Sequence, residues 1–87
     1  MIIKLHKKFI KQFRKLDDSI VASFVVRRDL FLESRTHPLL NDHPLHGKYI
    51  NHRSFNITGD YRLIYKRLDV DTVLFYAIGT HHELFGL

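Results

Sequence analysis

The residues of this sequence that could do chemistry lie mostly in its C-terminal half. The 87-residue chain contains seven His residues, and His is the side chain whose unperturbed pKa lies nearest to neutrality. Proton carriers, phosphate-binding cations and an aromatic ring able to stack on a base all fall in predicted loops or strand ends: His43, His46, Lys48, Arg53, Asp60, Arg62, His81 and Phe85.

These groups are the ones needed to cleave RNA without a metal. A base takes the proton of a 2′-hydroxyl, whose oxygen attacks the adjacent phosphate. Cations stabilise the charged transition state, and an acid protonates the leaving 5′-oxygen. Composition alone leaves this as one interpretation among several, because loop His and strand Arg residues are more often plain surface residues.

Other kinds of site are disfavoured. The chain has no Cys, which excludes disulfides, thiolate metal sites and Cys nucleophiles. His43-x-x-His46 and His81-His82 could suggest zinc, but zinc needs three or four convergent ligands and no third ligand is evident. The sequence also lacks a nucleophile elbow, a phosphate-cradling glycine loop and a dinucleotide fingerprint. We therefore expect no metal and no cofactor.

Length and charge limit the classes of protein to which this chain can belong. The chain suits a single domain over residues 1–87, and its hydrophobic content of 45% indicates a folded protein. Lys and Arg number 14 against 9 acidic residues, which fits either a polyanionic partner or a well-solvated surface. Met1 to Lys8 lacks an apolar signal core and Ile20 to Val26 is too short to cross a bilayer, so we expect a soluble cytoplasmic protein with no membrane partner.

Two amphipathic helices are predicted after a short strand at residues 2–5. The first has an apolar face at helical spacing, formed by Leu5, Phe9, Phe13 and Leu16. The second follows the N-cap signal Asp17-Asp18-Ser19 and runs from Ser19 to Ser34. Its apolar stripe consists of Ile20, Val21, Phe24, Val25, Phe31 and Leu32. Within that stripe, Arg28 is expected to pack its stem and extend its head to water; the alternative is that it reaches a site at the sheet edge.

Three strands are predicted in the C-terminal half, at residues 53–58, 61–68 and 72–78, after a loop over residues 39–51. The last strand is apolar on both sides, which indicates an interior strand covered on both faces. Residues 79–85 are expected to extend past the end of the sheet. The order β-α-α-β-β-β predicts an α+β fold in which a helical hairpin packs on one face of an antiparallel sheet.

Four motifs, in order, resemble one known family. They are Asp42-His43-Pro44-Leu45-x-Gly47, Arg53-Ser54-Phe55, Asp60-Tyr61-Arg62-Leu63-Ile64-Tyr65 and Gly79-Thr80-His81-x-x-Leu84-Phe85. Together they resemble the YafQ-like branch of the RelE/ParE toxin superfamily. The resemblance implies a small type II toxin–antitoxin toxin: a metal-independent endoribonuclease that cleaves mRNA in the ribosomal A site and arrests translation. It also implies a cognate antitoxin, whose acidic or amphipathic segment wraps the toxin and holds it inactive.

The resemblance also suggests roles for individual residues. His43, Asp60 and His81 match catalytic positions, with His81 the leading proton carrier and His43 and Asp60 candidates for its partner. The predicted RNA-binding residues are His46, Lys48, Arg53, Arg62 and Phe85. Of these, Phe85 matches the pattern as a base-stacking residue, whereas the cations rest on charge and location.

Two departures from the pattern leave alternatives open. Asn56 replaces a His and cannot transfer a proton at neutral pH, and Ala77 replaces an Arg. Arg62 is a candidate substitute for the missing charge, and His46 or His82 for the missing proton carrier. A toxin that inhibits DNA gyrase by binding is one alternative function. A catalytically decayed domain that only binds its antitoxin and DNA is another.

Overall fold

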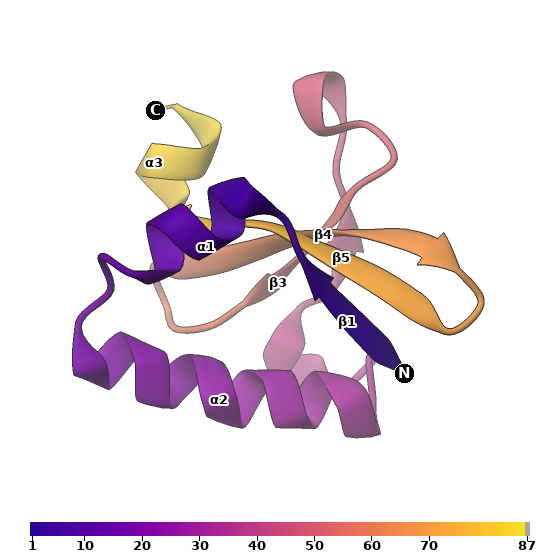
Figure 1. The fold of residues 1–87 in the computed structure, drawn as a ribbon, viewed down its shortest axis with the longest axis horizontal. Helices are drawn as coiled ribbons and strands as arrows, with labels where there is room; N and C mark the ends of the chain where they lie inside the picture. The colour runs from indigo at the N-terminus through magenta and orange to yellow at the C-terminus, as the bar shows by residue number, and fades with distance from the viewer. Residues whose placement is uncertain (87) are drawn as a thin grey trace.

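A computed structural model describes residues 1–86 of the chain (Figure 1). Two short 3-10 helices, η1 and η2, accompany the strands and α-helices. The elements in chain order are β1 (Ile2–Leu5), α1 (Lys7–Phe13), α2 (Asp18–Glu33), η1 (Pro38–Leu40), β2 (His43–Pro44), η2 (Gly47–Tyr49), β3 (Arg53–Asn56), β4 (Tyr61–Asp69), β5 (Thr72–Thr80) and α3 (His81–Phe85).

The five strands form one sheet in the order β1-β5-β4-β3-β2. β2, β3, β4 and β5 pair antiparallel, whereas β1 pairs with β5 in parallel. The predicted α+β class is confirmed, but the expectation of an entirely antiparallel sheet is wrong for β1. Its partner is more than sixty residues away in the chain, and local patterns do not determine the direction of such a pair. The prediction that β5 is an interior strand is confirmed.

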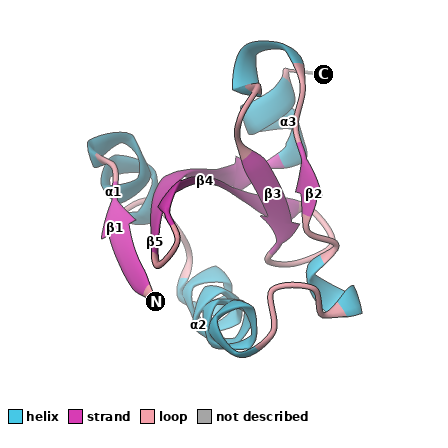
Figure 2. Ribbon diagram, turned by 90° about the vertical axis from the view of Figure 1, so that its right-hand side faces the viewer, coloured by secondary structure: helices cyan, strands magenta, loops and turns pink. Residues whose placement is uncertain are grey.

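The sheet has a core on each face. The larger core joins aromatic side chains of α1 and α2 to the sheet, through Phe9, Phe24, Phe31, Phe55 and Phe75. The smaller core on the opposite face consists of Tyr49, Ile64, Ala77 and Leu84. The prediction that both helices pack on one face is confirmed by their shared core. Figure 2 shows that α2 lies across the sheet while α1 lies at the edge beside β5.

The first helix is shorter than predicted. Leu5 belongs to β1 and is about half exposed, and Leu16 lies beyond the end of α1 but still packs against the larger core. The helix begins where the ring of His6 accepts a hydrogen bond from the backbone N–H of Lys8 (3.0 Å). The predicted apolar face is correct at its centre, because Phe9 is 2% exposed and stacks on Phe13.

Helix α1 completes the edge of β5 that β1 is too short to cover. The backbone N–H of His6 donates to the carbonyl of Phe75 (2.9 Å), and that of Ile78 donates to the side-chain oxygen of Gln12 (2.9 Å). Unpaired edge groups would otherwise face water or another strand. These bonds fix the position of α1 beside the second half of β5.

The C-terminal segment differs from the prediction in two respects. β5 continues through Thr80, beyond the predicted end at residue 78, and residues 81–85 form the short helix α3. Thr80 and Glu83 form a capping box that starts this helix. The hydrogen bonds from the backbone and side chain of Thr80 hold the pKa of Glu83 below its usual value. Thus α3 has a defined position at the end of the sheet.

The segment predicted as a loop over residues 39–51 contains ordered structure. Its strand β2 pairs with β3, placing His43 opposite Ser54 and Pro44 opposite Arg53. The short helices η1 and η2 flank this strand.

Among residues 1–86, no helix has the length and apolar character needed to cross a lipid bilayer.

Candidate functional site

One hollow brings together four of the predicted site residues. It has a volume of about 460 Å³ and lies where β2, β3, β4 and α3 meet. We call it the histidine hollow, and its lining residues are Asn41, His43, Leu45, Ser54, Arg62, His81 and Phe85. The side chains come from distant parts of the chain, so the pairing of β2 with β3 and of β4 with β5 is what assembles the site.

His43 is held in one tautomer by its local structure. Its Nδ1 lies 2.7 Å from the carbonyl oxygen of Asn41, and a carbonyl only accepts hydrogen bonds, so Nδ1 carries the proton when the ring is neutral. The backbone of Asn41 is left-handed, with φ of 47°. Nε2 of His43 is therefore the unprotonated nitrogen, which is the arrangement required of a general base.

Arg62 supplies a positive charge that is fixed at one corner. Its Nη1 donates to the carbonyls of Thr58 (3.1 Å), Gly59 (2.8 Å) and Tyr61 (3.4 Å) in the β3–β4 turn. These bonds anchor the guanidinium through Nη1, while Nε and Nη2 have no hydrogen-bond partner within residues 1–86. In the pairing of β4 with β5, Arg62 lies opposite Gly79. Gly79 directly precedes Thr80 and His81 of the C-terminal motif.

His81 and Phe85 enter the hollow from α3. The backbone N–H of His81 donates to the carbonyl of Asp60 (3.0 Å), which ties the start of α3 to the β3–β4 turn. Because the two residues are four apart on a helix, their rings lie together, with centroids 4.9 Å apart. The imidazole of His81 is solvent-exposed and lies at a tilt of 47° to the ring of Phe85.

Ser54 lines the hollow but was not predicted as a functional residue. Its side chain is completely buried, and its hydroxyl oxygen has no hydrogen-bond partner within residues 1–86. Buried hydroxyl groups normally have a partner. The signal in the sequence was the alternation of β3, which places Ser54 and Asn56 on one face and Arg53 and Phe55 on the other.

The other predicted site residues lie outside this hollow. Asp60 is exposed in the β3–β4 turn and touches the site through its backbone bond to His81. His46 is exposed at the start of η2. Lys48 lies over the ring of Tyr49, with Nζ 5.1 Å from the centroid, and lines a different hollow.

Arg53 belongs to a partly buried polar network on the opposite face. Its Nε donates to Oδ1 of Asp42 (2.6 Å), and the hydroxyl of Tyr65 donates to Oδ2 of the same carboxylate (2.5 Å). The bond to Asp42 raises the pKa of Arg53, and burial, reinforced by Asp42, raises the pKa of Tyr65. This network fastens the segment before β2 to the sheet.

The two positions that depart from the expected pattern have different surroundings. Asn56 is half-buried beside the site, opposite Arg62 in the strand pairing, and its Oδ1 has no hydrogen-bond partner within residues 1–86. Ala77 is completely buried in the smaller core with Tyr49, Ile64 and Leu84. An amide thus remains near the hollow at the first position, while the second has become part of the packing.

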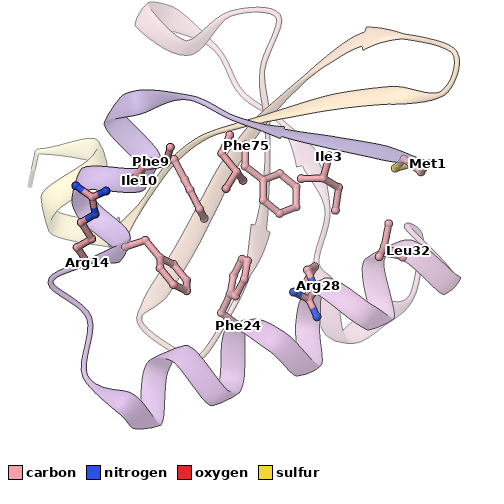
Figure 3. Close-up of a pocket in the computed structure, with 11 residues that line it drawn as sticks. Met1, Ile3, Phe9, Ile10, Arg14, Phe24, Arg28, Leu32 and Phe75 are labelled. Atoms are coloured by element: carbon pink, nitrogen blue, oxygen red, sulfur yellow. The ribbon is translucent and has the colours of Figure 1, made fainter.

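A larger, apolar groove lies on the face covered by α1 and α2 (Figure 3). It has a volume of about 640 Å³ and is bounded by β1, α1 and α2. Arg14 and Arg28 are the charged side chains that line it. Arg28 also pairs with Asp29 (3.0 Å), and its guanidinium lies 5.8 Å from the centroid of Phe24, so its stem packs and its head reaches the surface. The apolar part of the lining consists of Met1, Ile3, Leu5, Phe9, Ile10, Phe13, Phe24, Leu32 and Phe75.

The chain is similar to proteins of known structure. A family described as the bacterial toxin of type II toxin–antitoxin systems, YafQ, matches residues 1–86. The structure of YafQ from E. coli strain BL21(DE3) superposes with a TM-score of 0.79 at 24% identity, covering 97% of each chain. YafQ in the E. coli DinJ–YafQ complex gives a TM-score of 0.76 at 26% identity, with the same coverage.

A metal-bound toxin from Helicobacter pylori is also similar, with a TM-score of 0.72 at 27% identity over 98% of this chain and 99% of that one. Within residues 1–86 of the present chain, no three or more His, Cys, Asp or Glu side chains are grouped to hold a metal ion. A comparison with curated proteins gave no match.

Proposed function

The chain belongs to the YafQ family of bacterial type II toxin–antitoxin toxins, and from this premise we propose that it is a ribosome-dependent endoribonuclease that cleaves mRNA and arrests translation. The observation that carries the proposal is the convergence of His43, Arg62, His81 and Phe85 on one hollow. Two proton carriers, a cation and a ring for stacking are thereby available to one phosphodiester.

The proposed reaction is an internal phosphoryl transfer. Nε2 of His43 accepts the proton of a 2′-hydroxyl, and the 2′-oxygen forms a bond to the adjacent phosphorus. The bond from phosphorus to the 5′-oxygen breaks, and His81 in its protonated form donates a proton to that oxygen. The products are a 2′,3′-cyclic phosphate and a 5′-hydroxyl. His43 has the role of base because its Nδ1 is engaged with Asn41, and His81 has the complementary role of acid.

The remaining residues of the hollow position the substrate. Arg62 neutralises the phosphate through the edge of its guanidinium that the turn carbonyls leave open. Phe85 stacks on a base next to the scissile bond, with its ring already held against His81. The buried hydroxyl of Ser54 donates to a ligand oxygen, which supplies the partner it otherwise lacks. Asp60 acts indirectly, by fixing the backbone of His81.

The cognate antitoxin is the proposed protein partner, and the apolar groove is its proposed docking site. In the E. coli complex, the YafQ toxin is bound to DinJ. Exposed apolar side chains such as Leu5 and Leu32 line the groove together with two arginines. Figure 3 shows Arg14 and Arg28 well apart along it. An amphipathic segment with acidic flanking residues complements this surface in both shape and charge.

The experiment that tests the function is an mRNA cleavage assay with mapped ends, on programmed ribosomes and on free RNA. We expect wild type to cut in the A site and His81→Ala to leave the RNA intact. Activity should persist when a chelator removes transition metals and leaves the magnesium that ribosomes need, because the proposed acid and base are imidazoles; loss of activity there would overturn metal independence.

A toxin that acts only by binding is the second candidate, because Ala77 provides no cation at the position where the family pattern has Arg. Intact RNA under all conditions would reject the nuclease. DNA damage signalling on expression, without mRNA cleavage, would then favour gyrase as the target.

A further inference from the structure

A second hollow on the same face as the histidine hollow combines lysines with aromatic rings. It has a volume of about 340 Å³ and is lined by Lys8, Lys48, Tyr49, His52 and Tyr76. We call it the tyrosine hollow. Its residues come from α1, η2, the segment after η2 and β5, so only the folded chain brings them together. No acidic side chain within residues 1–86 lines it.

The cations of this hollow lie over the faces of its rings. Nζ of Lys8 is 5.0 Å from the centroid of Tyr76, and Nζ of Lys48 is 5.1 Å from that of Tyr49. The ring of His52 lies 5.2 Å from that of Tyr76. Aromatic faces next to ammonium groups are the elements by which proteins bind single-stranded nucleic acid: a base stacks on a ring and the phosphate pairs with a cation.

A β-bulge directs Tyr76 into this hollow. Phe75 pairs with Tyr65 and Ala77 with Ile64, so Tyr76 is an extra residue without a cross-strand partner. As a result, Tyr76 and Ala77 both face the smaller core, whereas Phe75 and Ile78 face the larger one. Regular alternation would have placed Tyr76 and Ala77 on opposite faces. The bulge therefore leaves a partly exposed tyrosine ring on the site face.

The other rings are held by hydrogen bonds. The hydroxyl of Tyr49 donates to the carbonyl of Leu84 (3.1 Å), which locks its ring against α3. Nδ1 of His52 donates to the carbonyl of Ile50 (3.1 Å). His6 adds a further ring, 4.8 Å from that of Tyr76. A surface of fixed rings binds a base at a lower entropic cost than mobile side chains would.

The two hollows share a wall. Tyr49 lines the tyrosine hollow and Phe85 lines the histidine hollow, and the centroids of these two rings are 5.9 Å apart. A strand that places its scissile phosphate between His43 and His81 can therefore continue across Phe85 and Tyr49. The next stacking surface on that path is Tyr76, with Lys8 and Lys48 beside it.

We propose that the tyrosine hollow is a second nucleotide-binding subsite, which holds a nucleotide of single-stranded RNA adjacent to the cleavage site. The inference rests on the proposed nuclease function for the identity of the ligand. Tyr76 and His52 stack on the base, and Lys8 and Lys48 bind the flanking phosphates. In this role Lys48 remains an RNA-binding residue, as the sequence predicted, but it acts outside the catalytic hollow.

The test is a binding measurement that does not depend on cleavage. A fluorescein-labelled single-stranded RNA hexamer is titrated by anisotropy across a range of salt concentrations, with every variant carrying His81→Ala. We expect the double variant with Lys8→Ala and Lys48→Ala to bind the hexamer more weakly. The slope of the logarithm of its binding constant against the logarithm of the salt concentration should be shallower by about 1.4, the value for two phosphate contacts on a single strand. Tyr76→Ala should weaken binding roughly 5- to 160-fold, the cost of one stacked base, while Tyr76→Phe should retain affinity.

The matched control is the pair Lys7→Ala and Lys15→Ala, which removes the same charge from exposed positions outside both hollows. It should leave the salt slope unchanged. Equal slopes for the two lysine double variants, or unchanged binding in Tyr76→Ala, would overturn the subsite, as would a chain that binds no hexamer at all.

Cleavage on ribosomes by the chain with His81 intact is measured separately. If that chain cleaves mRNA but the variants of the tyrosine hollow bind the hexamer as well as the parent does, the subsite is rejected and the nuclease function stands. If that chain does not cleave mRNA but these variants still weaken binding, the nuclease function is rejected and the subsite stands.

Discussion

The two faces of the sheet differ in what covers them. On one face, α1 and α2 bury a cluster of phenylalanines and leave an apolar groove beside β1. On the other face, η2, the short helix α3 and the start of α1 give partial cover, and polar side chains line two hollows. Figures 1 and 2 show α3 and the η2 segment on the opposite side of the sheet from α2.

This difference follows from the length of the covering elements. The sixteen-residue α2 supplies enough apolar surface for a core, whereas the five-residue α3 cannot cover the ends of β3, β4 and β5. Backbone carbonyls therefore stay near water, where that of Gly59 in the β3–β4 turn binds Arg62 and that of Asn41, before β2, binds His43. A small domain thus separates the face that provides most of its stability from the face proposed for chemistry.

Replacing Phe9 with Ala should have the largest effect and should fall on stability. Phe9 is 2% exposed and contacts the rings of Phe13, Phe24 and Phe75. Removing a buried phenylalanine costs about 3–5 kcal/mol, enough to unfold a marginal domain. Urea unfolding monitored by circular dichroism measures this, with the exposed Val26→Ala as control. A loss below about 1 kcal/mol would mean that the larger core does not depend on α1.

Replacing His81 or His43 with Ala should abolish most activity with little change in stability. Each proton carrier contributes about 10²–10⁴-fold to the rate, and the double variant should lose less than the product of the two because the residues act as a unit. Cleavage rates on programmed ribosomes measure this. His37→Asn, which removes an imidazole outside the hollow and keeps a capping side chain, is the control. Full activity in His81→Ala would refute its assignment as the acid.

Introducing a charge into the apolar groove should weaken antitoxin binding without affecting cleavage. Leu32 is 44% exposed, so Leu32→Glu should fold, but its carboxylate would face an apolar partner. We expect a loss of at least about 30-fold in affinity, equivalent to the 2 kcal/mol of an interface hot spot. Calorimetry with the cognate antitoxin measures it, with Val70→Glu, exposed and outside the groove, as the control. Unchanged affinity would place the antitoxin elsewhere.

Removing the capping carboxylate of α3 should have the smallest effect. The pKa of Glu83 is lowered in the folded state by its bonds to Thr80, so the ionised form contributes stability above the unfolded-state pKa. That stability is lost as the pH falls through the folded-state pKa. Glu83→Gln should therefore be slightly less stable than wild type at neutral pH, and this difference should shrink in acid. Unfolding curves of both proteins from neutral to acid pH measure this. A difference in stability that stays constant with pH would mean that the ionised cap is not its cause.

Local patterns were sufficient for much of the fold. The spacing of Phe9 and Phe13, the Asp17-Asp18-Ser19 signal and the apolar strand at residues 72–78 each predicted an element that is present, with ends displaced by a few residues. The motifs around His43 and His81 identified the family. These features were readable because helical and strand periodicity depends on near neighbours in the chain.

The site was less predictable, because its composition depends on which face each strand residue occupies. Arg53 was expected to bind phosphate, yet it lies opposite Tyr65 and pairs with Asp42 on the other face, while its neighbour Ser54 lines the hollow. A one-residue difference in register decides between these positions. The short strand β2, which sets His43 opposite Ser54, lay in a segment predicted as a loop.

The sequence by itself determined the class of fold, the family and the kinds of side chain available for chemistry, since these follow from composition, periodicity and motif. Only the tertiary structure decided that β1 runs parallel to β5, that a bulge turns Tyr76 onto the site face, and that His43 and His81 line one hollow. Each of those outcomes depends on strand pairing between residues far apart in the chain. Such pairing is set by the packing of the whole domain, which no local stretch of sequence contains.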